Sequence, residues 1–266
     1  MRRIFSKQNR ALISELVRTD FKLRYQGSVL GYAWSLLNPL LIFVILYVVF
    51  VKFLKIGDAI PHYPIYLLLG IVIWNFFVEM TMQSTTSLVT RGDLIKKIRI
   101  PRWMIVFSSS IGALINLGLN LIVVAVFMIV NKVGILDTLP RIIFPLLEIY
   151  MLALGLSLLL SALFVKFRDV SYIWQVILQA GFYVTPIIYP LSRITDATLQ
   201  KLLMISPMAQ AIQNVRYDAI THTATTTSSV FANGYYQFIP IVITVVIFFV
   251  GVLYFKSQAK YFAENI

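Results

Sequence analysis

Long runs without charge constrain this chain more than any other feature of its sequence. Between Gln26 and Leu54 the only charged residue is Lys52, and the run Trp103–Asn131 contains none. Each run exceeds the roughly 20 apolar residues that a helix needs to cross the hydrocarbon core of a bilayer. The strands of a membrane β-barrel are alternating segments of about ten residues, so these runs favour helices. We therefore expect an all-α integral membrane protein.

The composition supports a fold that faces lipid. Apolar residues make up 59% of the 266 residues, whereas soluble globular domains contain about 45–50%. A single core cannot absorb that excess in a chain of this size, so much of the apolar surface must face lipid. The chain has no cysteine, which excludes disulfides and thiolate metal sites.

Six membrane spans are predicted from the hydropathy pattern. They are Tyr32–Phe53, Tyr63–Leu88, Trp103–Val130, Ile142–Val165, Val170–Tyr189 and Gln237–Phe255. We treat 1–266 as a single domain, with a cytoplasmic N-terminal segment 1–31, a six-helix membrane region 32–255 and a cytoplasmic tail 256–266.

Basic residues indicate which segments are cytoplasmic. Segments 1–31, 89–102, 166–169 and 256–266 hold 16 of the 23 Lys and Arg residues. Cytoplasmic segments of membrane proteins carry such an excess, so both termini are expected in the cytoplasm. This placement accounts for the net charge of +12 through topology and attraction to anionic membrane lipids, and we do not expect nucleic acid as a partner.

An amphipathic helix is predicted ahead of the first span, over Lys7–Gln26. Its apolar positions recur at helical spacing and are Ile13, Leu16, Val17 and Phe21. Basic and polar residues occupy another face, which is typical of a helix that lies in the membrane interface. A solvated N-terminal helix is the alternative interpretation.

The segment Leu191–Asn214 departs from the pattern of plain spans. It follows Pro186 and Pro190, and it alternates short apolar clusters with polar residues and Pro207. Each piece is too short to cross a bilayer. Short re-entrant or interfacial helices are therefore expected on the outer side, before the last span.

No motif for catalysis or nucleotide binding is present in the sequence. None of the 12 glycines is followed by lysine, so there is no phosphate-binding P-loop, and no zinc-protease or nucleophile-elbow motif occurs. We expect a transport subunit and not an enzyme, with no cofactor or metal bound to this chain.

Polar residues inside the spans are candidates for a translocation path. Glu79 and Glu148 are the carboxylates within predicted spans, and such groups are costly in hydrocarbon unless they face water or a partner. For Glu79 a translocation role and a structural hydrogen bond have equal weight, and for Glu148 we favour the structural role. On the third span, Asn116 and Asn120 continue a four-residue repeat that either packs helices closely or lines a wet path.

Aromatic residues form 14% of the chain, and many of them are expected in interfacial belts. We select Trp34, Phe182 and Tyr183 as candidates for inward positions, where a ring can stack on a sugar face. For each of them the belt interpretation has equal weight.

The inner connection Thr90–Arg102, TRGDLIKKIRIPR, is predicted to dock a partner protein. It holds five basic residues, one aspartate and an apolar core of Leu94, Ile95 and Ile98. This pattern indicates a short amphipathic helix that projects into the cytoplasm. A charged loop that only sets the topology is the alternative interpretation.

Several segments resemble ABC-2-type permeases that export polysaccharides. They are LVRTDFKLRYQGSVLGYAWSLLNPL (Leu16–Leu40), LLLGIVIWNFFVE (Leu67–Glu79), TRGDLIKKIRIPR (Thr90–Arg102), VKFRDVSYIWQ (Val165–Gln175), TPIIYPLSRI (Thr185–Ile194) and SPMAQAIQNVRYDAI (Ser206–Ile220). The similarity follows nearly the whole chain in order and spacing, with Ser206 in place of the usual asparagine before Pro207. Gram-positive exporters of rhamnose-rich wall polysaccharide are the most similar members, and teichoic-acid and O-antigen exporters are relatives.

The resemblance implies an assembly and a cargo. Two permease chains would pair with two copies of a separate ABC ATPase that binds ATP and Mg, and would export a lipid-linked glycan across the bacterial cytoplasmic membrane. The N-terminal helix would be the interface helix. The coupling helix that enters the ATPase would consist of Asp93, Leu94, Ile95, Lys96, Lys97 and Ile98.

Three other functions remain open on the sequence alone. An ABC-2 exporter of drugs or lipids shares the fold and differs in cargo. A proton-coupled carrier would use Glu79, although the spans offer few further titratable groups. A membrane-embedded lipid–sugar transferase would need a cluster of acidic residues with His or Arg, and none is visible.

Overall fold

The structure is a computed structural model that describes residues 7–25, 27–55, 60–97, 100–134, 139–231 and 234–262. All regular secondary structure in these residues is helical, as predicted. The α-helices are α1 Lys7–Tyr25, α2 Trp34–Leu46, α3 Tyr63–Thr90, α4 Gly92–Lys97, α5 Trp103–Val130, α6 Leu139–Lys166, α7 Val170–Val184, α8 Ala197–Met204, α9 Pro207–Ala219, α10 Thr227–Val230 and α11 Ile239–Gln258. A π-helical segment, Tyr47–Phe53, prolongs α2, and short 3₁₀ turns lie at Gly31–Ala33, Leu191–Arg193, Tyr236–Phe238 and Ala259–Tyr261.

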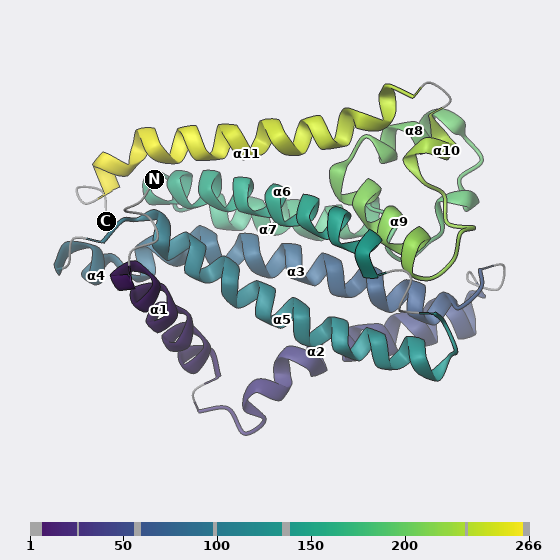
Figure 1. Cartoon of the computed structure of the whole chain (residues 1–266), viewed down its shortest axis with the longest axis horizontal. Helices are drawn as coiled ribbons and strands as arrows, with labels where there is room; N and C mark the ends of the chain where they lie inside the picture. Colours follow the sequence, from purple (N-terminus) through teal and green to yellow (C-terminus); the bar gives the residue numbers. More distant parts are fainter. Residues whose placement is uncertain are drawn as a thin grey trace.

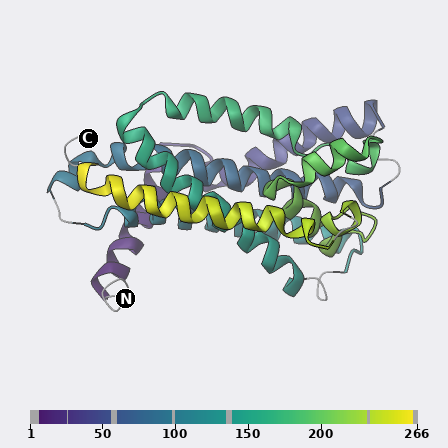
Figure 2. The same ribbon diagram turned by 90° about the horizontal axis from the view of Figure 1, so that it is seen from above.

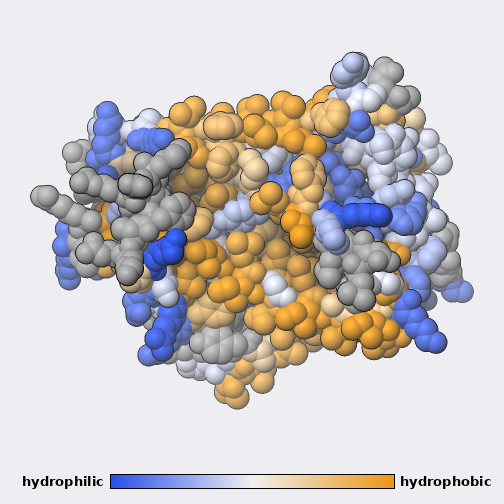
Figure 3. Space-filling model, viewed as in Figure 1, coloured by the Kyte–Doolittle hydropathy of each residue, from blue (hydrophilic) through white to orange (hydrophobic). Residues whose placement is uncertain are grey.

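The long helices lie side by side along the long axis of the molecule (Figure 1), and a second view from above shows the same bundle (Figure 2). Hydrophobic residues form a broad band across the middle of the surface, whereas hydrophilic residues gather towards the two ends (Figure 3). An apolar band between two polar ends matches the hydrocarbon core of a bilayer and its two interfaces. The bundle is therefore built to cross a membrane several times.

Within the described residues, five helical segments are long and apolar enough to cross a membrane, by length and composition. They are Trp34–Phe53, Tyr63–Thr90, Trp103–Val130, Pro140–Lys166 and Tyr236–Tyr261. Each of them corresponds to one of the predicted spans, and the third begins and ends at the predicted residues. The positions of these helices were therefore predicted correctly from the long uncharged runs in the sequence.

The fifth predicted span, Val170–Tyr189, is shorter in the structure. Its helix, α7, is apolar but has 15 residues and ends at Val184. Thr185 takes an extended conformation with φ −69° and ψ 135°, because the ring of Pro186 disfavours the helical region for the residue before it. The predicted boundary at Tyr189 is therefore wrong.

Helix α3 forms the centre of the bundle. Its most apolar window is 78% buried, whereas the windows of the α2 and α11 spans are 11% and 22% buried. Helix α3 packs against α5 and α6 and also contacts α2, α7 and α9. The exposed apolar surfaces of α2 and α11 are left for lipid or for another protein chain.

One end of the bundle, here called the α4 end, carries α1, α4 and the last turn of α11 (Figure 1). Helix α1 packs across α5 there. Asp20 of α1 forms an ion pair with Arg91, which directly follows α3. The opposite end, here called the α9 end, carries α8, α9 and α10 (Figure 1).

The short helices predicted before the last span are present at the α9 end. Helix α8 has 8 residues and α9 has 13, both fewer than the roughly 20 residues of a spanning helix. Pro207 opens α9, in agreement with the preference of proline for the first helical position. Because α9 packs against α6 and contacts α3 and α11, it belongs to the bundle and not to a surface loop.

Candidate functional site

A polar cavity of about 400 Å³ lies between α2, α3 and α5. Its apolar lining residues are Trp34, Pro39, Phe76, Val78 and Leu117, and its polar lining residues are Ser35, Asn38, Asn75, Glu79, Gln83, Asn116 and Asn120. Polar side chains inside a membrane bundle are costly and mark functional sites. The cavity brings together Trp34, Glu79, Asn116 and Asn120, which the sequence analysis selected for a translocation path.

Helical spacing gathers the polar residues on one side of each helix. On α3, Asn75, Glu79 and Gln83 recur every four residues, and on α5 Asn116 and Asn120 do the same. Residues four apart lie one above the other on a helix face. Two polar stripes, one from α3 and one from α5, therefore border the same cavity.

Glu79 joins the two stripes. Its Oε1 atom accepts hydrogen bonds from Nε2 of Gln83, at 3.0 Å, and from Nδ2 of Asn116 on α5. Nδ2 of Asn120 donates to the backbone oxygen of Ser35 on α2 at 3.2 Å and to that of Asn116 at 2.8 Å. Side chains at the cavity thus link α2, α3 and α5.

Two buried amide atoms at the cavity have no hydrogen-bond partner in the described part of the chain. They are Nδ2 of Asn75 and Oδ1 of Asn116. Because an unpaired buried polar atom costs about 1–3 kcal/mol, a water molecule or a ligand hydroxyl that pairs with it binds favourably. One atom is a donor and the other an acceptor, which suits the cavity to ligands rich in hydroxyl groups.

The three aromatic candidates do not lie in one place. Trp34 lines the cavity and is 44% exposed. Phe182 and Tyr183 lie on α7, and neither lines the cavity. The ring of Phe182 lies 6.2 Å from that of Trp74 on α3, whereas Tyr183 is 63% exposed. Phe182 therefore fills space between α3 and α7, whereas the ring of Tyr183 is exposed on the surface.

Glu148, the other carboxylate of the spans, lies away from the cavity. It is buried on α6 and lies close to Gln210 of α9. Neither of its carboxylate oxygens has a hydrogen-bond partner within the described residues, so the structural role expected for Glu148 stays a prediction.

Sequence reasoning missed a buried basic residue, Arg216 on α9. Its side chain is fully buried. The guanidinium donates to three backbone oxygens, those of Tyr66 at 3.1 Å, Pro186 at 2.5 Å and Ile187 at 2.7 Å. It also lies 3.6 Å from the centre of the Tyr66 ring. Arg216 thus fastens α9 to α3 and to the segment that follows α7.

The sequence carried only a weak signal for this contact. Gln210, Gln213 and Arg216 recur every three residues on one face of α9, and a polar helix face ordinarily meets solvent. In the structure all three are buried, and the hydroxyl of Tyr66 donates to Oε1 of Gln213 at 3.0 Å. The packing of α9 into the bundle is what makes this polar face internal.

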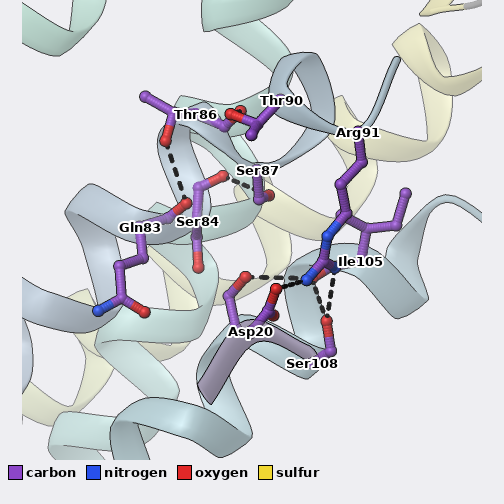
Figure 4. A network of polar contacts seen from close by, with 10 residues as sticks. Asp20, Gln83, Ser84, Thr86, Ser87, Thr90, Arg91, Ile105 and Ser108 are labelled. Carbon is purple, nitrogen blue, oxygen red and sulfur yellow. Dashed lines mark hydrogen bonds and ion pairs between the residues drawn. The ribbon is translucent and has the colours of Figure 1, made fainter. Parts of the chain in front are cut away.

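At the α4 end, Arg91 connects three helices (Figure 4). It follows α3, forms an ion pair with Asp20 of α1 and donates to Oγ of Ser108 on α5 at 3.1 Å. Burial lowers the pKa of the Arg91 guanidinium from its ordinary value. This contact holds α1 against the bundle.

The apolar stripe predicted for the N-terminal helix lies on α1. Leu16 is buried, and Ile13, Val17 and Phe21 are half-buried. These last three residues line a groove between α1 and α5. The stripe is therefore directed at the bundle and the groove, and a position of α1 in the membrane interface stays a prediction.

The segment predicted to couple with an ATPase forms α4, at the extreme of the α4 end (Figure 1). The exposed side chains are those of Asp93, Lys96 and Lys97, and the half-buried ones are those of Leu94 and Ile95. Ile95 packs against an apolar cluster at the same end of the bundle. Ile98, the last residue of the prediction, lies outside the described residues. Helix α4 is thus anchored by its apolar side and presents charged groups to solvent.

Comparison with known sequences places this arrangement in a family. The sequence model described as ABC-2 type transporter matches residues 11–218. The O-antigen export system permease protein RfbA of Myxococcus xanthus is 28% identical over 265 residues, which cover 97% of this chain and 96% of that protein. A protein of the same name from Klebsiella pneumoniae is 29% identical over 208 residues, which cover 77% of this chain and 78% of that protein. The chain belongs to the ABC-2 type transporter family.

Proposed function

We propose that this chain is the permease subunit of an exporter that moves a lipid-linked polysaccharide across the bacterial cytoplasmic membrane. The observation that carries the cargo class is the similarity, over almost the full length of the chain, to permeases named for O-antigen export. The polar cavity supports this cargo, because a hydroxyl-rich ligand needs donors and acceptors inside an otherwise apolar bundle. Rhamnan and teichoic acid belong to the same class of cargo.

In this proposal a separate ABC ATPase supplies the energy, and ATP with Mg binds to that subunit. Helix α4 is suited to dock in a cleft of the ATPase, since it presents Asp93, Lys96 and Lys97 to solvent. Arg91 adjoins α4 and contacts Asp20 and Ser108, so a movement of α4 is passed to α1, α3 and α5. The ATPase then biases the permease between two states through differential contacts.

A second copy of this chain completes the assembly, with two ATPase subunits. Helices α2 and α7 leave apolar and aromatic side chains exposed, among them Ile45, Tyr172 and Tyr183, and such surfaces suit protein–protein contact. The surplus of basic residues supports a cytoplasmic position for the α4 end. Both terminal segments are then cytoplasmic.

Within the pathway, Glu79, Asn116 and Asn120 contact the hydroxyl groups of the glycan, and Trp34 stacks on a sugar ring. Tyr183 contributes from α7, at the surface shared with the second copy, and Phe182 contributes from its place between α3 and α7. The support for these roles is the convergence of the first four residues on one cavity. Glu79 acts here as a hydrogen-bond acceptor held by Asn116 and Gln83.

The test is to delete the gene for this chain in the source organism and to complement the deletion strain with a tagged copy. We expect the strain to lose surface polysaccharide and to accumulate lipid-linked glycan inside the cell, and the tagged chain to restore export and copurify with an ABC ATPase. Unchanged surface polysaccharide together with altered drug efflux would contradict the glycan cargo and identify a drug exporter of the same family.

A further inference from the structure

A second and larger hollow lies between α1 and α5. This groove has a volume of about 770 Å³. Its lining residues are Arg10, Ile13, Ser14, Val17, Arg18 and Phe21 of α1 and Trp103, Phe107, Ile111 and Ile115 of α5. The two sets of lining residues share no member, so the groove is separate from the polar cavity.

The α5 wall of the groove has the depth of one membrane leaflet. Trp103 is the first residue of α5, and Phe107, Ile111 and Ile115 follow at intervals of four residues on one helix face. Twelve residues at a rise of 1.5 Å correspond to about 18 Å. The hydrocarbon core of a bilayer is about 30 Å thick, so this wall reaches from the interface to near its middle.

The α1 side of the groove carries positive charge. Arg10, Ser14 and Arg18 recur every four residues along α1 and are exposed. The acidic residues of α1, Glu15 and Asp20, are not among the described lining residues, and Asp20 is paired with Arg91. Figure 3 shows hydrophilic residues over α1, at the lower left, beside the apolar band. The groove thus combines an apolar wall with a basic rim.

We propose that this groove binds one anionic phospholipid from the leaflet at the α4 end. Its acyl chains lie against Trp103, Phe107 and Ile111, and its phosphate lies between Arg10 and Arg18. An apolar cleft one leaflet deep matches the acyl chains, and the charge of the rim is complementary to that of the headgroup. A zwitterionic lipid fits the same wall and lacks the net charge that the rim selects.

The position of the groove gives the bound lipid a structural role. Near the end of α1, the ion pair of Asp20 with Arg91 already holds the helix to the bundle. The lipid fills the space between α1 and α5 along the preceding turns. A ligand that binds only the packed position of α1 increases the population of that position.

Trp103 provides a reporter for the test. The full-length chain, with any ATPase that copurifies, is reconstituted in phosphatidylcholine vesicles that contain no glycan lipid. Brominated phosphatidylglycerol is added in one titration and brominated phosphatidylcholine in another, over the same range of fractions. Bromine on an acyl chain quenches tryptophan fluorescence on contact. The quenching that disappears in the Trp103→Phe variant is the quenching of Trp103. Because Trp103 also lines another hollow, with Leu158 and Val252, only the part that responds to substitutions on α1 is assigned to the groove.

We expect brominated phosphatidylglycerol to quench Trp103 at a lower fraction than brominated phosphatidylcholine. The variants Arg10→Gln and Arg18→Gln should each lower this preference about fivefold, the equivalent of ~1 kcal/mol. An Arg10→Lys, Arg18→Lys double variant should keep the preference. Lys22→Gln is the matched control, because Lys22 is exposed on α1 and does not line the groove.

Three results would overturn the proposal. Equal quenching by the two lipids would mean that ordinary bilayer lipid fills the groove. Quenching by neither lipid would mean that another protein chain covers it. A loss of preference in Lys22→Gln as large as in Arg18→Gln would assign the effect to diffuse charge. Since no glycan is present, each outcome is independent of the proposed cargo.

Discussion

Polar side chains inside this bundle form hydrogen bonds in two different environments, one beside a cavity and one enclosed by protein. Glu79 accepts hydrogen bonds from Gln83 and Asn116 beside a cavity, whereas Arg216 is enclosed by protein and donates to backbone oxygens. A group beside a cavity is accessible to a ligand, and an enclosed group is not. We therefore expect changes at the Glu79 network to affect transport, and changes at Arg216 to affect stability.

Asn116→Ala removes a donor to Glu79 and an unpaired acceptor at the cavity. We expect export of the glycan to fall about tenfold, the equivalent of about 1.4 kcal/mol, with normal amounts of protein in the membrane. Surface polysaccharide per permease chain is the measurement. Asn131→Ala is the control, since Asn131 caps the end of the same helix and is exposed. An equal effect of the two variants would contradict the role of the cavity.

Arg216→Met removes the donor of the backbone oxygens of Pro186 and Ile187, which lie outside the helices. Because each buried unpaired group costs about 1–3 kcal/mol, we expect a loss of about 3 kcal/mol or more. Thermal unfolding of the purified chain in detergent measures it. Arg141→Met, at an exposed arginine on α6, should leave the midpoint unchanged. A wild-type midpoint for Arg216→Met would show that these contacts do not stabilise the fold.

At the scale of elements, close backbone contact joins α6 to α11. A Cβ atom added to Gly251 would lie 2.1 Å from the backbone oxygen of Gly155, and one added to Gly155 would lie 2.6 Å from Cα of Phe248. Small residues allow membrane helices to approach in this way, where packing replaces the hydrophobic effect as the force of association. The two glycines thus determine how near α11 lies to the rest of the bundle.

Gly251→Ala should therefore separate α6 from α11, because the obstructing atom belongs to the backbone and cannot rotate away. We expect a destabilisation of about 1–3 kcal/mol, as for other overpacked sites, seen as a lower midpoint of thermal unfolding. Gly118→Ala on α5 is the matched control, since a Cβ there meets nothing within 4 Å. Should both variants unfold at the wild-type temperature, the contact would not limit the packing of α11.

At the scale of the whole molecule, the two polar ends have different structures. The α4 end has an exposed charged helix and the amphipathic helix α1, and the α9 end has short helices packed into the bundle (Figure 1). The surface at the α4 end is suited to a soluble partner and to the membrane interface. The α9 end closes the bundle on the opposite side of the membrane.

Reversing the charge of Lys96 and Lys97 to Glu tests the difference between the ends. If α4 docks in the ATPase, we expect the amount of copurified ATPase to fall at least tenfold, while the chain still inserts in the membrane. The control is Lys132→Glu with Lys201→Glu, two exposed lysines of the opposite side. Copurification at the wild-type level in the α4 variant would contradict docking through this helix.

Much of the fold follows from the sequence because lipid is the solvent. A long uncharged run has to form a helix in hydrocarbon, since only internal hydrogen bonds satisfy its backbone. Trp103–Val130 was therefore predicted to the residue, and α3, α6 and α11 to within a few residues. The end of α7 does not follow from apolar composition, which continues to Tyr189, because Pro186 disfavours a helical conformation of Thr185.

Only part of the candidate site can be predicted from the sequence. A four-residue repeat identified Asn116 and Asn120, and the cost of a buried charge identified Glu79. Their meeting in one cavity with Trp34, and the burial of Arg216, depend on which helices pack together. The sequence determines which segments enter the membrane, because that choice is made residue by residue against lipid. The tertiary structure alone decides which polar faces meet. Helices associate in a membrane through van der Waals packing, which depends on the shapes of both partners, so the sequence of one helix does not specify its neighbour.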